Sequence, residues 1–514
     1  MSAGDPGPAN GPPPGALPGS NRLFWAAVAL LWVAAAAGML GPIQAMTHTV
    51  TRDYNEGWNA FWSQAALRGE DLYPPAGASI SDNYPPLSFF VVGMLGRTVG
   101  DNIVAGRLVA LASFCAILLA IFAWLRLVGC SRAAAAAGGG VFLAGFVGFA
   151  PAFVAMNDPQ LLAHATMVTG LYVLWRSRSG SPAIAVAAAL MVLAGFTKHL
   201  LLPLPLAVGT WLALYDRRRF ALWASAGAAA ALLLFLVFWT VYGTDFFHSL
   251  LAGRVYSVHE ARIRTRNAIA AFAPMLALGA IAATSAWRSG PHCSRGAAIR
   301  LVLLYGAAAL SIGALAAGGK GVDVNAFFDL LIASSLGAGL GLMALRSGEV
   351  PRFSAATGSR LSVVALWLSA LIVCWGIARR LPQEIALMQR LDEREVMTRD
   401  DVRTVRELGH GRAACEELAL CYWAGTSFQV DFFNYGQKLK TGMLAHSSCD
   451  RLFGTDRFDV VQIDRDIGLG SSRLTAACNS VIREHFVPIR QSPSGEILLR
   501  KSLLARSGPA AHVR

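Results

Sequence analysis

The sequence predicts an all-α polytopic membrane domain of about eleven transmembrane helices, followed by a small C-terminal α/β soluble domain. Apolar stretches of roughly 17–25 residues recur between Leu23 and Ile377, and each is long enough to span a bilayer. Only 15% of the 514 residues are charged, whereas a soluble domain carries about a quarter. The mean hydropathy of +0.48 agrees with this class. Beyond residue 380 the chain becomes charged, which separates the C-terminal part.

The positions of the apolar stretches give the expected spans. They are 23–41, 103–126, 133–155, 160–175, 182–198, 200–215, 221–242, 268–287, 298–317, 325–345 and 361–379. The segment 86–100 is also apolar, but it is short and rich in glycine. We therefore place it as a juxtamembrane element within a first outer loop, 42–102. The proline- and glycine-rich residues 1–22 are expected to be disordered, and without a basic n-region the run from Leu23 is a retained span.

The arginines indicate the orientation of these spans. With eleven spans, the loops on the side of the N-terminus hold most of them: Arg126, Arg132, Arg176, Arg178, Arg217, Arg218, Arg219, Arg288, Arg295, Arg300, Arg346, Arg352 and Arg360. This is the positive-inside pattern. It predicts a multi-pass protein of a bacterial cytoplasmic (inner) membrane, with a cytoplasmic N-terminus and an extracytoplasmic C-terminal domain. The net charge of +13 is explained in the same way, so no nucleic-acid partner is expected.

The segment "TRDYNEGWNAFWSQAALRGEDLYPP", residues 51–75, predicts an amphipathic helix near the outer membrane surface. Its apolar positions recur at helical spacing and suit the headgroup level: Tyr54, Trp58, Phe61, Trp62 and Ala65. Asp53 stands where a carboxylate caps free backbone N–H groups. In the simplest interpretation Asp53 is only a cap and Glu56 is a solvated acid in the first turn.

Residues 381–514 form the expected extracytoplasmic domain. The segment 381–409 has helical periodicity, whereas "RFDVVQID" and "GEILLRKSLL" read as strands. Four cysteines lie in this part: Cys415, Cys421, Cys449 and Cys478. In an oxidising compartment they predict one or two disulfides, with three pairings open if all four are bridged. Four others are expected to be unpaired: Cys115, Cys130, Cys293 and Cys374.

Several polar residues gather on the expected outer face. Asp158, before Pro159, lies at the end of a span and could act only as a helix cap. Lys198 and His199 lie between two spans, where they could be snorkelling anchors. Asn325 and Asp329 are four residues apart on one expected helix face.

Asp329 lies inside an apolar run. An acid within the membrane indicates a functional site by default, with a buried polar pairing as the alternative.

The loop 243–267 is strongly basic on the face where such charge is disfavoured. It holds Arg254, Arg262, Arg264 and Arg266, with His259 and Glu260 among them. A solvated loop is one interpretation. An anionic partner, such as a lipid phosphate, explains the placement better, because arginine pairs bidentately with phosphate oxygens. Acids and phosphate-binding bases on one face suggest transfer of a group from a phospholipid carrier.

These motifs resemble those of the GT-C superfamily of membrane glycosyltransferases, which use polyprenyl-phosphate sugars. The bacterial branch with protein O-mannosyltransferases and aminoarabinose transferases is most similar over residues 23–380. The pattern "DYNEGWNAFWSQAALRGEDLYPP…NYPPLSFF" resembles its acidic first loop with a Tyr-Pro segment and a Pro-Pro pair. "NDPQLL" resembles the acid at the end of its third span, "GFTKHLLLPLPLA" its Thr-Lys element, and "KGVDVNAFFD" a late Lys/Gly/Asn element. Relatives often carry Asp-Glu where this chain has Asn55-Glu56.

The resemblance implies an inverting hexosyl or pentosyl transfer from a polyprenyl-phosphate-linked sugar to an envelope glycan, lipid or protein acceptor, in contact with membrane lipids. Either Asp53 or Glu56 would be the general base, and Asp158 would orient the acceptor or bind a metal. The expected donor-phosphate ligands are Lys198, His199, Arg254, Arg262 and Lys320. The expected substrate-binding residues are Tyr84, Asn157, His259, Asn325 and Asp329. A divalent metal is possible as cofactor, but no ligand spacing identifies one.

Two other classes of function compete with this prediction. A transporter or lipid flippase favours broken helices near the midplane and inverted repeats, and the sequence has no convincing repeat. A non-catalytic membrane protein whose C-terminal domain binds an envelope partner is the second. The acids at 53, 56 and 158 count weakly against it.

Overall fold

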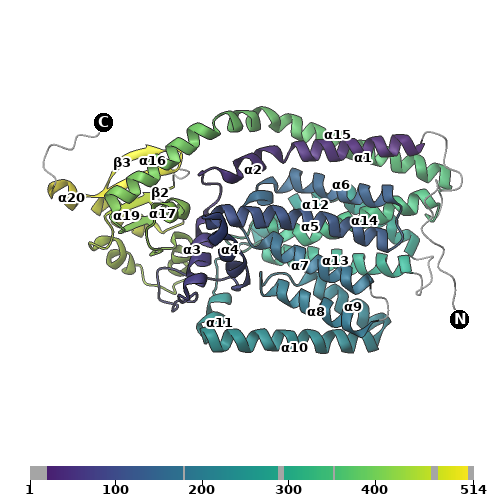
Figure 1. Cartoon of the computed structure of the whole chain (residues 1–514), viewed down its shortest axis with the longest axis horizontal. Coiled ribbons are helices and arrows are strands. Elements are labelled where there is room, and N and C mark those ends of the chain that lie inside the picture. Colours follow the sequence, from purple (N-terminus) through teal and green to yellow (C-terminus); the bar gives the residue numbers. More distant parts are fainter. Residues whose placement is uncertain (1–19, 177–179, 287–293, 351–352, 465–472, 507–514) are drawn as a thin grey trace.

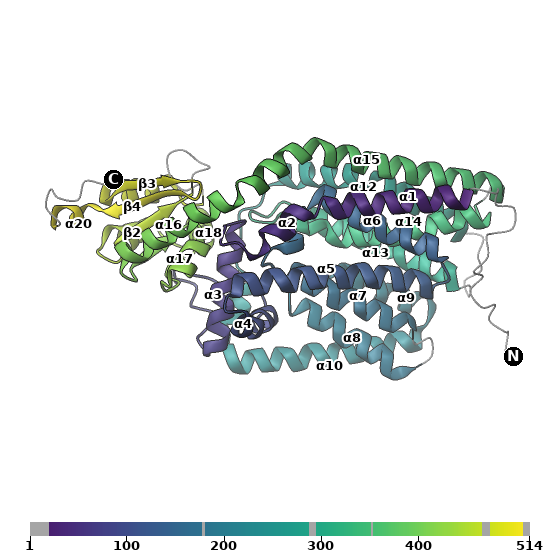
Figure 2. The same cartoon turned by 45° about the horizontal axis from the view of Figure 1, so that its top comes forward.

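The chain folds into a bundle of long helices with a small sheet-containing part at one end (Figure 1). The structure is a computed structural model that describes residues 20–176, 180–286, 294–350, 353–464 and 473–506. Three arginines of the expected inner loops, Arg178, Arg288 and Arg352, lie outside these residues, as do Cys293 and most of the tail 1–22. The described N-terminus and the sheet lie at opposite ends of the molecule (Figures 1 and 2).

The helices of the bundle follow the expected spans closely. They are α1 (Ser20–Ala37), α2 (Leu40–Gln44), α5 (Asn102–Leu127), α6 (Arg132–Phe149), α7 (Gln160–Arg176), α8 (Ser181–Gly195), α9 (Pro203–Tyr215), α10 (Arg217–Tyr242), α11 (Asp245–Leu250), α12 (Val258–Ala286), α13 (Ser294–Ala316), α14 (Phe328–Ser347) and α15 (Ala355–Gln389). Short 3₁₀ turns precede three of the later segments: η1 (Ala45–Thr47), η2 (Pro151–Ala155) and η3 (Val324–Phe327). Two short helices, α3 (Tyr54–Arg68) and α4 (Leu87–Val99), fill the loop after α2.

The lengths of these helices test the span count. Within the described residues, seven helices are long and apolar enough to cross a membrane, and the bent pair α1–α2 makes an eighth. The chain is therefore a multi-pass membrane protein. The expected spans at 160–175, 182–198 and 200–215 correspond to α7, α8 and α9, which have 17, 15 and 13 residues. These three helices are shorter than a straight crossing requires, so the count of eleven stays a prediction.

Small residues hold the centre of the bundle together. Helix α14 is the most buried of the long helices: 94% of an 18-residue apolar stretch of it lies inside the protein. A Cβ at Gly341 would lie 2.0 Å from the backbone oxygen of Leu278 on α12, and one at Gly358 the same distance from that of Leu345. Without a hydrophobic driving force in lipid, such close backbone contacts are what stabilises helix packing.

The expected loop 243–267 is largely helical. Helix α11 occupies its first part, and α12 begins at Val258, so Arg262, Arg264 and Arg266 lie on the first turns of α12. The prediction of an irregular loop is wrong because helical periodicity continues N-terminal to the apolar run. Only the stretch around Arg254 stays non-helical, and Tyr256 there forms a β-bridge with Gly319.

The C-terminal part has the expected α/β composition. Its elements are α16 (Leu391–Gly409), β1 (Ala413–Cys415), α17 (Leu418–Ala424), α18 (Phe432–Lys440), η4 (Asp450–Gly454), β2 (Val460–Ile463), α19 (Ala476–His485), β3 (Phe486–Ser492), β4 (Gly495–Arg500) and α20 (Lys501–Arg506). The strand order is β1-β2-β4-β3, with β1 and β2 parallel and the other pairs antiparallel. Both strands predicted from the sequence are present as β2 and β4, but the second is shorter than predicted, because the chain turns into α20 at Lys501. Helix α15 runs without a break across residue 380.

The predicted disulfides are confirmed. Cys415 pairs with Cys421, and Cys449 pairs with Cys478. The first bridge lies in an apolar core that also contains side chains of α3, and the second lies in the core behind the sheet.

The aromatic stripe of α3 is covered by protein rather than by lipid headgroups. Trp58, Phe61, Trp62 and Ala65 are all buried, in a core shared with α4 and α17. A Cβ at Gly57 would lie 2.1 Å from the backbone nitrogen of Ala419 on α17, so the two helices touch directly. The periodicity thus identified the apolar face of α3 but not what packs against it, and the position of this helix at the headgroup level stays a prediction.

Helix α4 lies beside α3 at the sheet end of the bundle, where α5 also begins (Figure 1). Its 13 residues give a length of about 20 Å, which is too short for a straight span. Asp101, which caps α5, accepts a hydrogen bond from Trp423 Nε1 of α17 at 2.9 Å. Before the segment 86–100, Ser79 Oγ donates to the backbone oxygen of Gln429 at 2.6 Å. The chain on both sides of this segment is therefore tied to the C-terminal part.

We predict that α4 does not cross the membrane. Single cysteines at Ala76, before α4, and at Thr98, in its last turn, both occupy exposed positions and should react with an impermeant maleimide from the same side. A cysteine at Arg218, an exposed position in the first turn of α10, is the control and should react only after permeabilisation. Reaction of Ala76→Cys and Thr98→Cys from opposite sides would contradict the assignment.

Candidate active site

A fully buried ion pair joins α3 of the first outer loop to α5. Glu56 on α3 and Arg107 on α5 are both 0% exposed. Arg107 Nε donates to Glu56 Oε1 at 2.7 Å and Nη2 donates to Oε2 at 2.6 Å, which is a bidentate geometry. The interpretation of Glu56 as a solvated acid is wrong, since both of its carboxylate oxygens are occupied.

Arg107 also forms hydrogen bonds with the backbone of the segment that leads into α3. Arg107 Nη1 donates to the backbone oxygens of Ala45, Met46 and His48 at 3.3, 3.1 and 2.9 Å, and Nη2 donates to that of Val50 at 2.8 Å. The Arg107 guanidinium thus fixes the path of residues 45–50 and, through it, the start of α3.

Asn157 ties α3 to the segment before α7. Its backbone N–H donates to Glu56 Oε1 at 3.2 Å, and its side-chain amide donates to the backbone oxygen of Glu56 at 3.1 Å. Its own backbone oxygen accepts from Asn59 Nδ2 at 2.9 Å. A Cβ at Gly106 would overlap the Asn157 side chain, so this position requires glycine. These contacts position the following residue, Asp158.

Asp53 caps α3, as predicted. One of its carboxylate oxygens accepts from the backbone N–H of Asn55 at 2.8 Å. Among the described residues, no donor contacts its other oxygen. Burial raises the pKa of Asp53 to about 6, and the neighbouring carboxylates of Glu56, Asp158 and Asp323 raise it as well, whereas the Asn55 hydrogen bond lowers it. Asp53 therefore titrates near neutral pH.

Asp158, Lys198 and Tyr84 form a buried cluster from three different segments. Lys198 Nζ lies 3.5 Å from Asp158 Oδ1 and 3.7 Å from the centre of the Tyr84 ring. Lys198 is only 3% exposed, so the snorkelling interpretation is wrong. Asp158 Oδ1 also accepts the backbone N–H of Gln160 at 2.8 Å, which confirms its role at the start of α7.

One oxygen of this cluster lacks a protein partner. Asp158 Oδ2 is buried and has no hydrogen-bond partner among the described residues, and the same holds for Nδ1 of His199 beside Lys198. Buried polar atoms without partners are rare in native proteins and commonly mark a ligand or water site. The cluster thus has the chemistry to accept a hydroxyl from a bound substrate.

His199 connects the cluster to the basic stretch around Arg254. Burial lowers the pKa of His199 to about 4, and the positive charges of Lys198 and Arg254 lower it further. Arg254 Nη1 contacts the backbone oxygen of Lys320 at 3.4 Å, and its guanidinium lies 5.5 Å from the Phe433 ring of α18. Two pairs of the five predicted phosphate ligands are thus neighbours in the structure: Lys198 with His199 beside Asp158, and Arg254 with Lys320.

Two predicted residues, Arg262 and His259, are exposed on α12. Among the described residues no hydrogen bond or ion pair joins them to Lys198 or Asp158. Their substrate contacts stay predictions.

Asn325 and Asp329 belong to a second polar group inside the bundle. Asp329 accepts a hydrogen bond from Tyr305 at 2.6 Å and lies 3.4 Å from His164 Nε2. Asn325 lies in η3, which continues directly into α14, and its amide donates to Gln160 Oε1 at 3.4 Å. Gln160 in turn contacts His164, so Asn325 and Asp329 belong to the same chain of polar contacts. The alternative of a buried polar pairing describes Asp329 well.

The C-terminal part supplies further acids next to α3. Asp431 accepts hydrogen bonds from Tyr54 and from Trp58 Nε1, and burial raises its pKa. Glu417, whose pKa burial raises to about 8, is close enough to Asp53 for the two charges to interact. Arg473 lies 4.8 Å from the Tyr54 ring and 3.9 Å from Glu417. These residues of the C-terminal part lie next to the start of α3, where Asp53 is.

Several of these residues were missed by sequence reasoning. Arg107 is a lone charge near the start of an apolar run, which by itself signals a buried partner. His164 and Tyr305 stand within spans and give a weaker signal. Glu417 and Asp431 carry no local pattern that points to α3.

A separate apolar cavity of about 350 Å³ lies between α1, α6, α12 and α15. None of the predicted site residues lines it. It therefore does not define the site around Asp53 and Lys198.

The helix bundle, the two helices of the first loop and the C-terminal sheet together define the GT-C fold of membrane glycosyltransferases. Two solved structures of ArnT from Cupriavidus metallidurans share it, one bound to undecaprenyl phosphate and one in the apo state. The first has a TM-score of 0.58 at 14% identity and covers 93% of this chain and 98% of that one; the second has 0.58 at 13%, covering 93% and 97%. The resemblance to this superfamily is confirmed at the level of the fold.

A third structure, arabinofuranosyltransferase AftD from Mycobacteria, has a TM-score of 0.51 at 16% identity and covers 96% of this chain but only 40% of that protein. No protein-family model and no curated protein sequence matches the chain.

We predict that Glu56→Gln destabilises the protein by about 3–5 kcal/mol, because it leaves Arg107 charged, buried and unpaired. Chemical unfolding of the purified protein in detergent measures this decrease in the free energy of unfolding. Glu70→Gln, which removes an exposed acid just beyond the same helix, is the matched control. The double variant Glu56→Gln/Arg107→Gln should lose less than the sum of the two single variants. A Glu56→Gln protein as stable as the Glu70→Gln control would contradict the structural role.

Proposed function

We propose that the protein is a membrane glycosyltransferase that moves a sugar from a polyprenyl-phosphate donor to an envelope glycan, lipid or protein acceptor. The observation that supports this most is the position of Asp53. It has a free carboxylate oxygen and a raised pKa, and it lies at the same end of a GT-C bundle as the buried Asp158–Lys198 cluster. The ArnT structure that contains undecaprenyl phosphate supports the donor class.

Asp53 is the better of the two candidate bases. A general base needs an oxygen free to take a proton and a pKa near the working pH. Glu56 offers neither oxygen, because Arg107 binds both. The proposed role of Glu56 is to position α3 and its cap.

The proposed reaction is a single displacement with inversion. The acceptor hydroxyl attacks the anomeric carbon and forms the new C–O bond, while the bond from that carbon to the phosphate oxygen breaks. The hydroxyl proton passes to Asp53, and the bonding electrons leave with the polyprenyl phosphate. The free Oδ2 of Asp158 would accept a hydrogen bond from a substrate hydroxyl and orient it.

The departing phosphate carries negative charge that the basic region would stabilise. Lys198, Arg254 and Lys320 supply positive charge, and neutral His199 supplies a hydrogen bond. Preorganised charge of this kind lowers the barrier because it need not reorganise during the reaction.

The proposed orientation places this site outside the cytoplasm. Helices α3 and α4 of the first loop lie with the disulfide-bonded C-terminal part at one end of the bundle (Figure 2), and Asp53 caps α3 there. Helix α5 starts there and is about 39 Å long, so Arg126 in its last turn and Arg132 at the start of α6 lie at the other end. Basic loops favour the cytoplasmic side.

A panel of polyprenyl-phosphate sugars tests the proposal. Purified protein is incubated with each donor, and mass spectrometry detects released polyprenyl phosphate. Release with at least one donor, dependent on Asp53, supports the enzyme. If no donor is consumed while reconstituted protein moves such lipids between leaflets, the transporter alternative replaces it.

We predict that Asp53→Asn lowers kcat by roughly 10²–10⁴-fold, because the amide cannot take up the proton. Asparagine caps helices well, so the folded fraction should be kept. In the native protein, kcat/KM should rise with pH through about 6, since the base must be deprotonated to act and its raised pKa lies there. Steady-state release of polyprenyl phosphate at pH 5–8 measures both effects. An Asp53→Asn enzyme with unchanged kcat would contradict the assignment.

We predict that Lys198→Met raises KM for the donor as well as lowering kcat, because the Lys198 ammonium would bind the phosphate before and during its departure. Lys501→Met, an exposed lysine on α20, is the control and should leave both constants unchanged. Donor titrations of folded, size-homogeneous protein measure the constants. A Lys198→Met enzyme with unchanged KM for the donor would exclude phosphate binding at this residue.

A further inference from the structure

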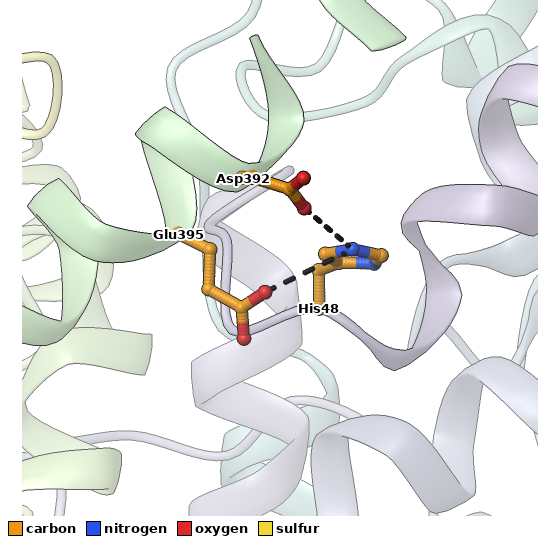
Figure 3. A group of neighbouring side chains, drawn as sticks. All are labelled: His48, Asp392 and Glu395. Carbon is orange, nitrogen blue, oxygen red and sulfur yellow. Dashed lines mark ion pairs between the residues drawn. The ribbon is translucent and has the colours of Figure 1, made fainter. Parts of the chain in front are cut away.

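Three potential metal ligands meet where the chain between α2 and α3 passes the start of α16. They are His48, after η1, and Asp392 and Glu395 in the first turns of α16 (Figure 3). Their spacing of three residues places both acids on one face of the helix. In the part of the chain that the structure describes, this is the only group of three such residues whose ligand atoms lie within 4.8 Å of one another.

The distances in this group fit a cation better than they fit hydrogen bonds. His48 Nε2 lies 3.6 Å from Asp392 Oδ1 and 3.8 Å from Glu395 Oε2. Hydrogen bonds between nitrogen and oxygen are about 2.7–3.2 Å long. Two ligands about 2.1 Å from one Zn²⁺, at angles between tetrahedral and trigonal, lie about 3.4–3.6 Å apart. The distance to Asp392 falls in this range, and that to Glu395 is about 0.2 Å longer.

The imidazole of His48 is oriented as a metal ligand. Its Nδ1 lies 3.0 Å from the backbone oxygen of Gln44, and a carbonyl oxygen only accepts, so Nδ1 carries the hydrogen. The lone pair of a neutral imidazole is then on Nε2, which faces the two carboxylates (Figure 3). Histidine ligands of metals typically donate their other N–H to a carbonyl or carboxylate in this way.

The carboxylates of Glu395 and Asp392 are also oriented and accessible for binding a cation. Glu395 Oε1 accepts from the backbone N–H of Thr49 at 3.2 Å and from Arg399 at 2.6 Å, which leaves Oε2 facing His48. The side chain of Asp392 is 94% exposed, so an ion and its remaining water ligands could reach the group from solvent.

We propose that His48, Asp392 and Glu395 bind one divalent cation of the zinc class, with solvent completing the coordination. One imidazole and two carboxylates form a donor set that suits Zn²⁺ and neighbouring first-row ions. This site contains neither Asp53 nor Asp158, and it is independent of the proposed transfer reaction.

The cation would fasten the C-terminal part to the first loop. His48 belongs to the segment whose backbone oxygens bind Arg107, and its own oxygen accepts from Arg107 Nη1 at 2.9 Å. Asp392 and Glu395 belong to the helix that leads into the sheet. A cation between them links α16 to the segment that fixes the start of α3.

Metal titration of the full chain tests this site. The protein is purified in detergent without a polyhistidine tag, stripped with chelator, and titrated with Zn²⁺ by calorimetry and with Co²⁺ by its visible absorption. We expect one ion per chain in the native protein and at least about tenfold weaker binding in Asp392→Asn and His48→Gln. Glu393→Gln and His446→Gln, which change an exposed neighbouring acid and an exposed histidine, should bind like the native protein.

Thermal unfolding distinguishes loss of metal binding from loss of folding in the variants. Because Asp392 is almost fully exposed, Asp392→Asn should unfold at the same temperature as the native protein without metal. Zn²⁺ should raise the unfolding temperature of the native protein and of Glu393→Gln but not that of Asp392→Asn. Equal affinity in native protein and Asp392→Asn, or no saturable binding at one ion per chain, would overturn the proposal.

Discussion

The buried pair between Glu56 and Arg107 is the interaction on which the rest of the site depends. Two charges without exposure to water are stable only when their polar atoms are satisfied, and here the guanidinium also takes four backbone oxygens from residues 45–50. The carboxylate in turn accepts the backbone N–H of Asn157. One pair therefore joins α3, α5, the loop after α2 and the start of α7. Removing either charge disturbs all four segments together, although neither group is free to react.

This pairing gives the acids of the site different roles. Glu56 is fixed by its partner, so the unpaired oxygens of Asp53 and Asp158 remain for a substrate. The C-terminal part closes the opposite side through Asp431, which binds Tyr54 and Trp58 of α3. The proposed reaction thus takes place between a rigid bundle end and a docked sheet-containing part. If a cation occupies His48 and Asp392, it strengthens the same junction from its other side.

Much of the fold could be predicted because it depends on local patterns. Each expected span corresponds to a helix, and Asp53 and Asp158 start helices as their sequence context indicates. What could not be predicted are the contacts between distant segments. Arg107 is 51 residues from Glu56, and no periodicity selects one partner over another. The stripe of Trp58 and Trp62 identified an apolar face, yet its cover is α17, whose sequence carries no matching signal. The basic stretch 258–266 was expected as a loop because its charge concealed a helical continuation of α12.

The position of the donor phosphate tests the central claim most directly. A cryo-electron microscopy map of the protein with bound undecaprenyl phosphate would locate that group without requiring turnover. The account predicts phosphate density within ion-pair distance of Lys198, beside His199 and Arg254 and facing Asp158. Density at the opposite end of the bundle, or in the apolar cavity between α1 and α15 with Lys198 uncontacted, would contradict it.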